Sequence, residues 1–172
     1  MRRILSIFLV CAAVLSAANI DFETLSMNFE QRVTNEKKQT LKFRGKLWLK
    51  QPDLARYDYE SPTPKTIAIK NKSVLMIEPD LMQATRFTSD IAVNIMELWR
   101  RGKMIDESTR EALINDVKVT LKHEGERFDR VYYKDEFDNF VEIIFTAHKR
   151  NIAIDDSFFA PKIPNGYDII RQ

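Results

Sequence analysis

The fold of this chain is decided by residues 40–50, which read Thr-Leu-Lys-Phe-Arg-Gly-Lys-Leu-Trp-Leu-Lys. The odd positions from Leu41 to Leu49 are apolar or glycine, and the even positions are polar or basic apart from Trp48. A period of two places these sets on opposite faces of a β-strand, one dry and one wet. The stretch therefore predicts a strand of a half-buried sheet.

Residues 54–59 alternate in the same way, and Gln51-Pro52-Asp53 has the composition of a turn, so the two stretches predict a hairpin. Further short strands are predicted at Thr66–Ile69, Val74–Glu78, Gln83–Thr88, Val117–Lys122, Phe128–Lys134, Phe140–Ala147 and Tyr167–Ile170. Such a succession is typical of one continuous antiparallel sheet that curls enough to have a concave face. The predicted fold class is mainly β.

A first helix is predicted after Ser89-Asp90, which can cap it. Its apolar stripe consists of Ile91, Ile95, Leu98 and Trp99. A second helix is predicted at residues 108–115, because Ser108-Thr109-Arg110-Glu111 fits a capping box. Helices across the concave face would cover it, and the interior would be either a packed core or a lidded pocket for an apolar ligand. Periodicity leaves both open.

Residues 1–18 predict a secretory signal peptide. A basic pair at residues 2–3 precedes an apolar run at residues 4–15, and Ser16-Ala17-Ala18 supplies the small residues of a cleavage site. The run is too short to span a membrane, which takes about 20 apolar residues. The expected organisation is a signal peptide at 1–18 and a single domain at 19–172.

Removal of this segment changes the composition of the chain. Cys11 lies inside the segment, so the mature domain has no cysteine and no disulfide, which suits a periplasmic location. The 27 Lys and Arg residues fall to 25 without Arg2 and Arg3, and equal the 25 Asp and Glu residues. A near-neutral domain gives no electrostatic reason to expect nucleic-acid binding.

The sequence predicts no catalytic residue, metal ligand or cofactor. His123 and His148 stand outside any metal-binding or nucleophile motif, and both are predicted to lie at the surface. The pairs Asp135-Glu136 and Asp155-Asp156 flank expected turns, where carboxylates are ordinary. Trp48, on the wet face, is expected to cover an edge or to pack under a neighbouring loop.

Several segments, in order along the chain, resemble the outer-membrane lipoprotein carrier family, LolA. They are Phe29-Glu30-Gln31-Arg32-Val33, Gly45 to Pro52, Arg56 to Tyr59, Pro79 to Thr85, and Phe158 through Pro164-Asn165-Gly166-Tyr167-Asp168-Ile169-Ile170. The resemblance implies an unclosed β-barrel with a helical lid over a hydrophobic cavity. It also implies a monomeric periplasmic carrier that takes lipoproteins from an inner-membrane ABC transporter to an outer-membrane acceptor or receptor.

The resemblance further implies which residues line the acyl-chain cavity: Leu49, Tyr57, Tyr59, Ile67, Ile69, Leu75, Ile77, Ile91, Ile95 and Leu98. Gln51 stands where the family has an arginine that bonds the lid, so Gln51 is the expected lid contact. Only Asn19 to Met27 separate the signal from the first strand, too few for the longer amphipathic helix that the family has there.

Two other classes of function remain as alternatives. A hydrolase on the same scaffold would need a nucleophile and a base that no motif of the chain supplies. A lipoprotein-sensing interaction domain could use the same half-barrel, because a fold does not fix a function.

Overall fold

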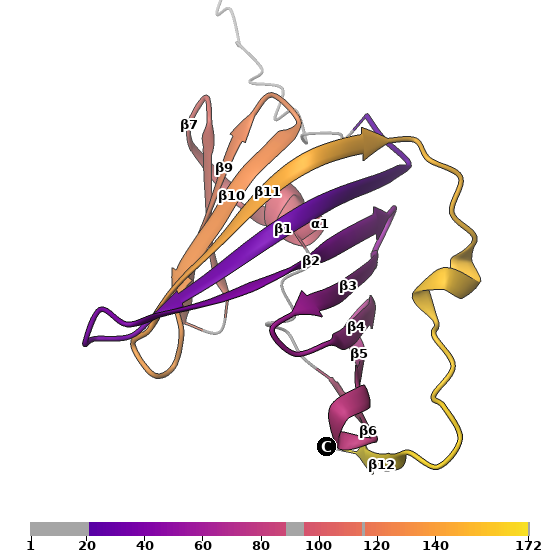
Figure 1. The fold of residues 1–172 in the computed structure, drawn as a ribbon. Coiled ribbons are helices and arrows are strands. Elements are labelled where there is room, and N and C mark those ends of the chain that lie inside the picture. Colours follow the sequence, from indigo (N-terminus) through magenta and orange to yellow (C-terminus); the bar gives the residue numbers. More distant parts are fainter. Residues whose placement is uncertain (1–20, 89–94, 115, 172) are drawn as a thin grey trace, which may run out of the picture.

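The computed structural model describes residues 21–88, 95–114 and 116–171 of the chain (Figure 1). The strands are β1 (Thr24–Thr34), β2 (Thr40–Lys50), β3 (Leu54–Ser61), β4 (Lys65–Lys70), β5 (Ser73–Glu78), β6 (Gln83–Thr88), β7 (Lys103–Asp106), β8 (Thr109–Ile114), β9 (Val117–Glu124), β10 (Arg127–Lys134), β11 (Phe140–Arg150) and β12 (Asp168–Arg171). The helices are α1 (Ile95–Arg101) and the 3-10 turns η1 (Pro79–Leu81) and η2 (Asp156–Phe159).

All twelve strands form one sheet in the order β12-β6-β5-β4-β3-β2-β1-β11-β10-β9-β8-β7. The sheet curls without closing, since β12 and β7 remain its two edges (Figure 1). The predicted half-barrel is confirmed. One detail was wrong, because β12 pairs with β6 in parallel, with Asp168 opposite Gln83, and the sheet is not wholly antiparallel.

The concave face carries the core. In β2 the buried residues are Gly45, Leu47 and Leu49, as the alternation predicted, but Leu41 on the same face is 66% exposed. Cross-strand pairing continues this row, with Leu49 beside Leu25 of β1 and beside Ala55 of β3. The buried apolar cluster consists of Phe22, Leu25, Met27, Phe29, Leu47, Leu49, Ala55, Tyr57, Ile69, Val74, Ile95, Met96, Leu98, Trp99, Val119, Leu121, Phe128, Val131, Val141, Ile143 and Phe145.

The helix predicted at 108–115 is wrong, because residues 109–114 form strand β8 between β7 and β9. The capping pattern serves the β7–β8 turn instead. Asp106 accepts hydrogen bonds from the Ser108 amide at 2.8 Å, the Ser108 hydroxyl at 2.9 Å and the Thr109 hydroxyl at 2.8 Å. A carboxylate that binds the residues after it caps a turn as readily as a helix.

The described part of the first predicted helix is α1, with Ile95, Met96, Leu98 and Trp99 buried. Ser89, Asp90 and Ile91 lie outside the described residues. Residues 21–23 are not helical and β1 begins at Thr24, so the described chain has no helix ahead of the first strand. Among the described residues, no helix is long and apolar enough to cross a membrane.

The C-terminal segment runs from the end of β11 along one side of the sheet to β12, and η2 within it contacts β3 and β4 (Figure 1). The ring of Phe158 in η2 lies 5.0 Å from that of Trp48, edge to face. Arg56 also contacts Phe158. Its guanidinium stacks on the Phe158 ring at 4.3 Å and donates a hydrogen bond of 2.9 Å to the Phe158 carbonyl. Trp48 therefore packs under a loop, as predicted.

Candidate functional site

The site is the apolar concave face together with the helix that covers part of it. Trp99 is the largest side chain that α1 buries there, and it is 4% exposed. Its ring lies 4.6 Å from the His123 ring and 5.5 Å from the Phe128 ring. His123 is on β9 and Phe128 on β10, so α1 is seated on the β8–β10 side of the half-barrel.

A buried arginine closes over the same ring. The guanidinium carbon of Arg110, on β8, lies 4.3 Å from the centre of the Trp99 ring. Arg110 is 6% exposed and donates a long hydrogen bond of 3.4 Å to the carbonyl of Gly102, just after α1. Burial lowers the pKa of this guanidinium, but an arginine stays charged. Helix α1 therefore packs, through Trp99, against a buried and charged guanidinium.

Beyond α1 the concave face is apolar and only half covered. Its half-buried apolar side chains, here called the open apolar set, are Val33, Tyr59, Ile67, Phe87, Ala112, Ile114, Val117 and Tyr133. The Tyr59 hydroxyl donates to Gln31 Oε1 at 2.7 Å. Burial raises the pKa of Tyr59 and of Tyr133, so both phenols stay neutral. These side chains offer a ligand shape and apolar contact, and the Lys65 ammonium lies 4.5 Å from the centre of the Tyr59 ring.

A groove of about 480 Å³ leads to this face between α1, β8 and the β4–β5 turn. Its lining is mixed, with apolar side chains such as Leu98, Ala112 and Ile114 and charged ones such as Lys72 and Arg101. A lining of both kinds suits an amphiphile, whose tail avoids water and whose head group does not.

The structure gathers most of the predicted cavity residues. Leu49, Tyr57, Ile69, Ile95 and Leu98 lie in the buried cluster, and Tyr59 and Ile67 pack against it from the open apolar set. That these residues contact acyl chains stays a prediction. The position of Ile91 lies outside the described residues.

Leu75 and Ile77 are misplaced in that prediction. Pairing sets Val74 opposite Ile69 and Met76 opposite Ile67, so Val74 and Met76 face the concave side. Leu75 and Ile77 face the outer side, where η2 packs against β3 and β4. Residues 74–77 are all apolar, so the strand shows no alternation from which its inward residues could be chosen.

Gln51 ties down the chain that enters β1. Its side-chain amide donates a short hydrogen bond to the Phe22 carbonyl, and its backbone amide donates to the Glu23 carbonyl at 2.9 Å. The start of the predicted lid, at residues 89–94, lies outside the described residues. A contact between Gln51 and the lid stays a prediction.

His123 was predicted to lie at the surface and does not, because it is 5% exposed beneath Trp99. His148 is half-buried and its Nε2 lies 2.8 Å from the Phe128 carbonyl. Arg110 and His123 were both missed as functional candidates. A charged residue on a predicted helix and a histidine near a predicted turn gave no sign of burial. No three His, Cys, Asp or Glu residues gather as a metal site within the described ranges.

The buried histidine predicts a loss of stability in acid. Burial lowers the pKa of His123 and so does the charge of Arg110, although the Gly125 carbonyl and Asp106 oppose the shift. Lys122 adds to the lowering. A group held neutral by folding stabilises fully above its unfolded pKa of about 6.5 and loses that contribution as the pH falls towards the folded value.

We therefore expect the thermal midpoint to fall between pH 7 and pH 5, and to fall less in His123→Gln. Thermal unfolding of both proteins at several pH values measures the fall of the midpoint. NMR titration of the His123 imidazole should give a pKa below that of an exposed histidine. An imidazole that titrates at or above that value would contradict the burial of His123.

The fold and the site together define a class of protein: a non-closed β half-barrel that presents an apolar concave face under a helix. Comparisons place the chain within this class. A model of the family described as "Outer membrane lipoprotein carrier protein LolA" matches residues 21–98. An outer-membrane lipoprotein carrier protein of Campylobacter jejuni is 32% identical over 171 residues, 99% of this chain and 100% of the relative.

Another relative with that name, from Helicobacter pylori, is 32% identical over 152 residues, 87% of this chain and 81% of its own length. Among solved structures, a LolA superfamily protein of Nitrosomonas europaea has a TM-score of 0.53 at 11% identity, over 83% of this chain and 92% of the other. At that identity the likeness concerns the fold alone. The sequence matches show that the chain belongs to the outer-membrane lipoprotein carrier family.

Proposed function

We propose that this protein carries lipoproteins by enclosing their acyl chains against its concave face. The observation that supports this most is the open apolar set, a half-buried apolar surface beside helix α1. The names of the relatives point to the same cargo. A sensing domain on the same fold is not favoured, since these relatives are named as carriers.

The physical task is transfer, and it needs no bond-making residue. Each buried CH₂ contributes about 0.8 kcal/mol, so the acyl chains of a lipoprotein hold it in a membrane by tens of kcal/mol. A carrier that offers apolar surface exchanges one apolar environment for another, and its own affinity can stay moderate. We propose accordingly that the protein is not an enzyme and acts without a cofactor.

The expected route follows from the same proposal. The mature protein begins near Asn19, resides in the periplasm, receives cargo from an inner-membrane ABC transporter and releases it at an outer-membrane acceptor. N-terminal sequencing of the exported protein tests the first step. Retention of Met1 in the mature protein would contradict it.

Cargo binding is tested with two matched substitutions. Ile67 and Leu75 are both half-buried apolar residues on adjacent strands, but Ile67 faces the concave side and Leu75 the outer side. Ile67→Gln should weaken binding of an acylated peptide about tenfold, since the loss of apolar contact costs roughly 1.4 kcal/mol. Leu75→Gln should leave it unchanged.

The measurement is displacement of an environment-sensitive apolar dye by the acylated peptide, with the unacylated peptide as control. Equal displacement by both peptides would mean that no acyl chain is recognised. An equal effect of both substitutions would place the binding surface elsewhere.

A further inference from the structure

Helix α1, which covers part of the concave face, is connected to β7 through Gly102. Gly102 follows α1 directly and leads into β7, and its amide donates to the Leu98 carbonyl at 2.8 Å. A Cβ at this position would lie 2.4 Å from that carbonyl oxygen and 3.2 Å from the Cβ of Arg110. Only glycine lets α1 end so close to β8, which brings Trp99 within reach of Arg110.

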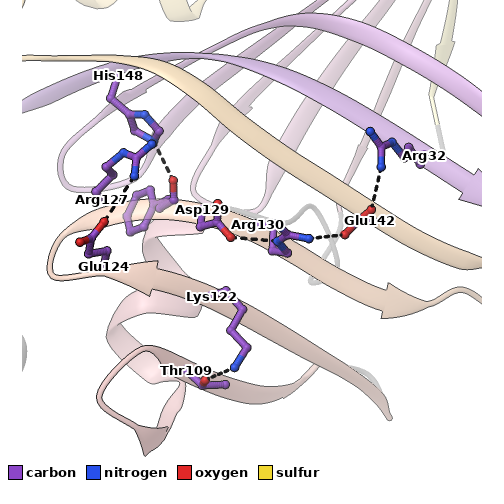
Figure 2. A network of polar contacts seen from close by, with 10 residues as sticks. Arg32, Thr109, Lys122, Glu124, Arg127, Asp129, Arg130, Glu142 and His148 are labelled. Carbon is purple, nitrogen blue, oxygen red and sulfur yellow. Dashed lines mark hydrogen bonds and ion pairs between the residues drawn. The ribbon is translucent and has the colours of Figure 1, made fainter.

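Arg110 differs from the arginines of the outer face in what it contacts. Figure 2 shows Arg130 bonded to Asp129 and to Glu142, both at 2.9 Å, with Arg32 on the other oxygen of Glu142 at 3.6 Å. Arg110 has no ion pair with a carboxylate in the part of the chain that the structure describes. Its contacts there are the Trp99 ring and the Gly102 carbonyl, and both belong to the cover.

Two buried polar atoms beside the Trp99 ring lack hydrogen-bond partners among the described residues, Nε of Arg110 and Nε2 of His123. A buried donor or acceptor without a hydrogen-bond partner costs free energy, and this cost disappears when the atom is exposed and water can bind it. Lifting α1 would expose both atoms. The docked position of α1 therefore combines favourable contacts, among them a cation–π contact, with a penalty that disappears when the helix leaves, and this penalty reduces the free energy that holds α1 in place.

We propose that Arg110, with His123 on the other strand, is a positioning residue that holds α1 over the concave face through Trp99 and so sets how readily an acyl chain enters. The inference rests on the proposed carrier function. Arg110 does not touch the cargo. It acts through the helix, because cargo can reach the face beneath α1 only when the Trp99 ring leaves the space between Arg110, His123 and Phe128.

The hold is tested first without cargo. Amide hydrogen exchange of residues 95–101 should rise about tenfold in Arg110→Ala, as loss of a desolvated cation–π contact allows. Exchange of β1 and β11 should stay as in the wild type. Arg110→Lys keeps a cation over the ring and should be intermediate. Arg130→Ala, which removes an arginine of the outer face, is the matched control and should not change exchange in α1.

The second measurement separates positioning from plain structural support. Arg110→Ala should lower the urea midpoint and yet raise the affinity for the apolar dye and the acylated peptide several-fold, because less work is needed to lift α1. If Arg110 only supported the fold, its substitution would lower both the stability and the affinity. In a Trp99→Leu background, Arg110→Ala should have a much smaller effect on both quantities, since only the long hydrogen bond to the Gly102 carbonyl remains to be lost.

Unchanged exchange in α1 would overturn the proposal, and so would an affinity that stays constant or falls. If the wild type bound neither the dye nor the acylated peptide, the proposed carrier function would be contradicted. Amide exchange in α1 would still test separately whether Arg110 holds the helix.

Discussion

Gly45→Ala is expected to lower the free energy of unfolding by about 3 kcal/mol, the upper range for atoms forced into a packed site. A Cβ on Gly45 would lie 2.1 Å from the Asp58 carbonyl oxygen and 2.9 Å from the Tyr59 Cα, both backbone atoms of β3. These atoms can move only if the β2–β3 pairing moves. The rings of Phe29 and Tyr59, on either side of this glycine, also meet at 4.9 Å.

Urea unfolding of the purified variant measures this loss. The matched control is Gly125→Ala in the β9–β10 turn, where a Cβ would meet nothing within 4 Å but φ is +55°. That change should cost only the left-handed backbone penalty, about 1 to 2 kcal/mol. Equal losses in the two variants would show that the clash with β3 is relieved without cost.

Trp99→Ala is expected to lower the free energy of unfolding by about 3 to 5 kcal/mol, as truncation of a buried tryptophan does. The loss includes the contacts with His123, Phe128 and the Arg110 guanidinium. The buried cation would then have no ring above it. Because α1 would be released, we also expect the apolar dye to bind more tightly in spite of the lower stability.

Trp99→Phe is the control, because it keeps an aromatic ring for the guanidinium and should cost less than half as much. Chemical unfolding and dye titration of the two variants give both quantities. A Trp99→Ala variant with wild-type stability would mean that α1 is not seated on β8–β10 in solution.

Alternation predicted the strands well where only one face of the sheet is apolar. Residues 40–50 and 54–59 show it clearly, and β2 and β3 pair there in the expected hairpin. The same rule could not orient β5, since Ile77 is buried on its outer face as well and all of residues 74–77 are apolar. The cavity residues that the family resemblance implied lie on the concave side from β2 to β4, and alternation could not correct that set in β5, where Val74 and Met76 face inward.

Local signals misled where tertiary contacts decide. The capping pattern at residues 108–111 belongs to a strand turn, because β8 gains a full ladder on β9 that an isolated short helix could not match. With that helix assigned, nothing in the sequence marked Arg110 as buried. Its burial, and that of His123, depends on where α1 docks, and no pattern within either strand reports it.

The order of the strands has a consequence for the time course of folding. Strands β1 to β6 are neighbours in sequence and in space, and so are β7 to β11, but the two series join only where β1 pairs with β11. Thr34 pairs with Phe140 and Leu25 with Arg150, contacts more than a hundred residues apart. Such distant contacts form slowly, because a long loop must close before they contribute. The centre of the sheet therefore cannot form until nearly the whole chain has been synthesised. The export that we propose, in which the chain crosses a membrane before it folds, would benefit from that delay.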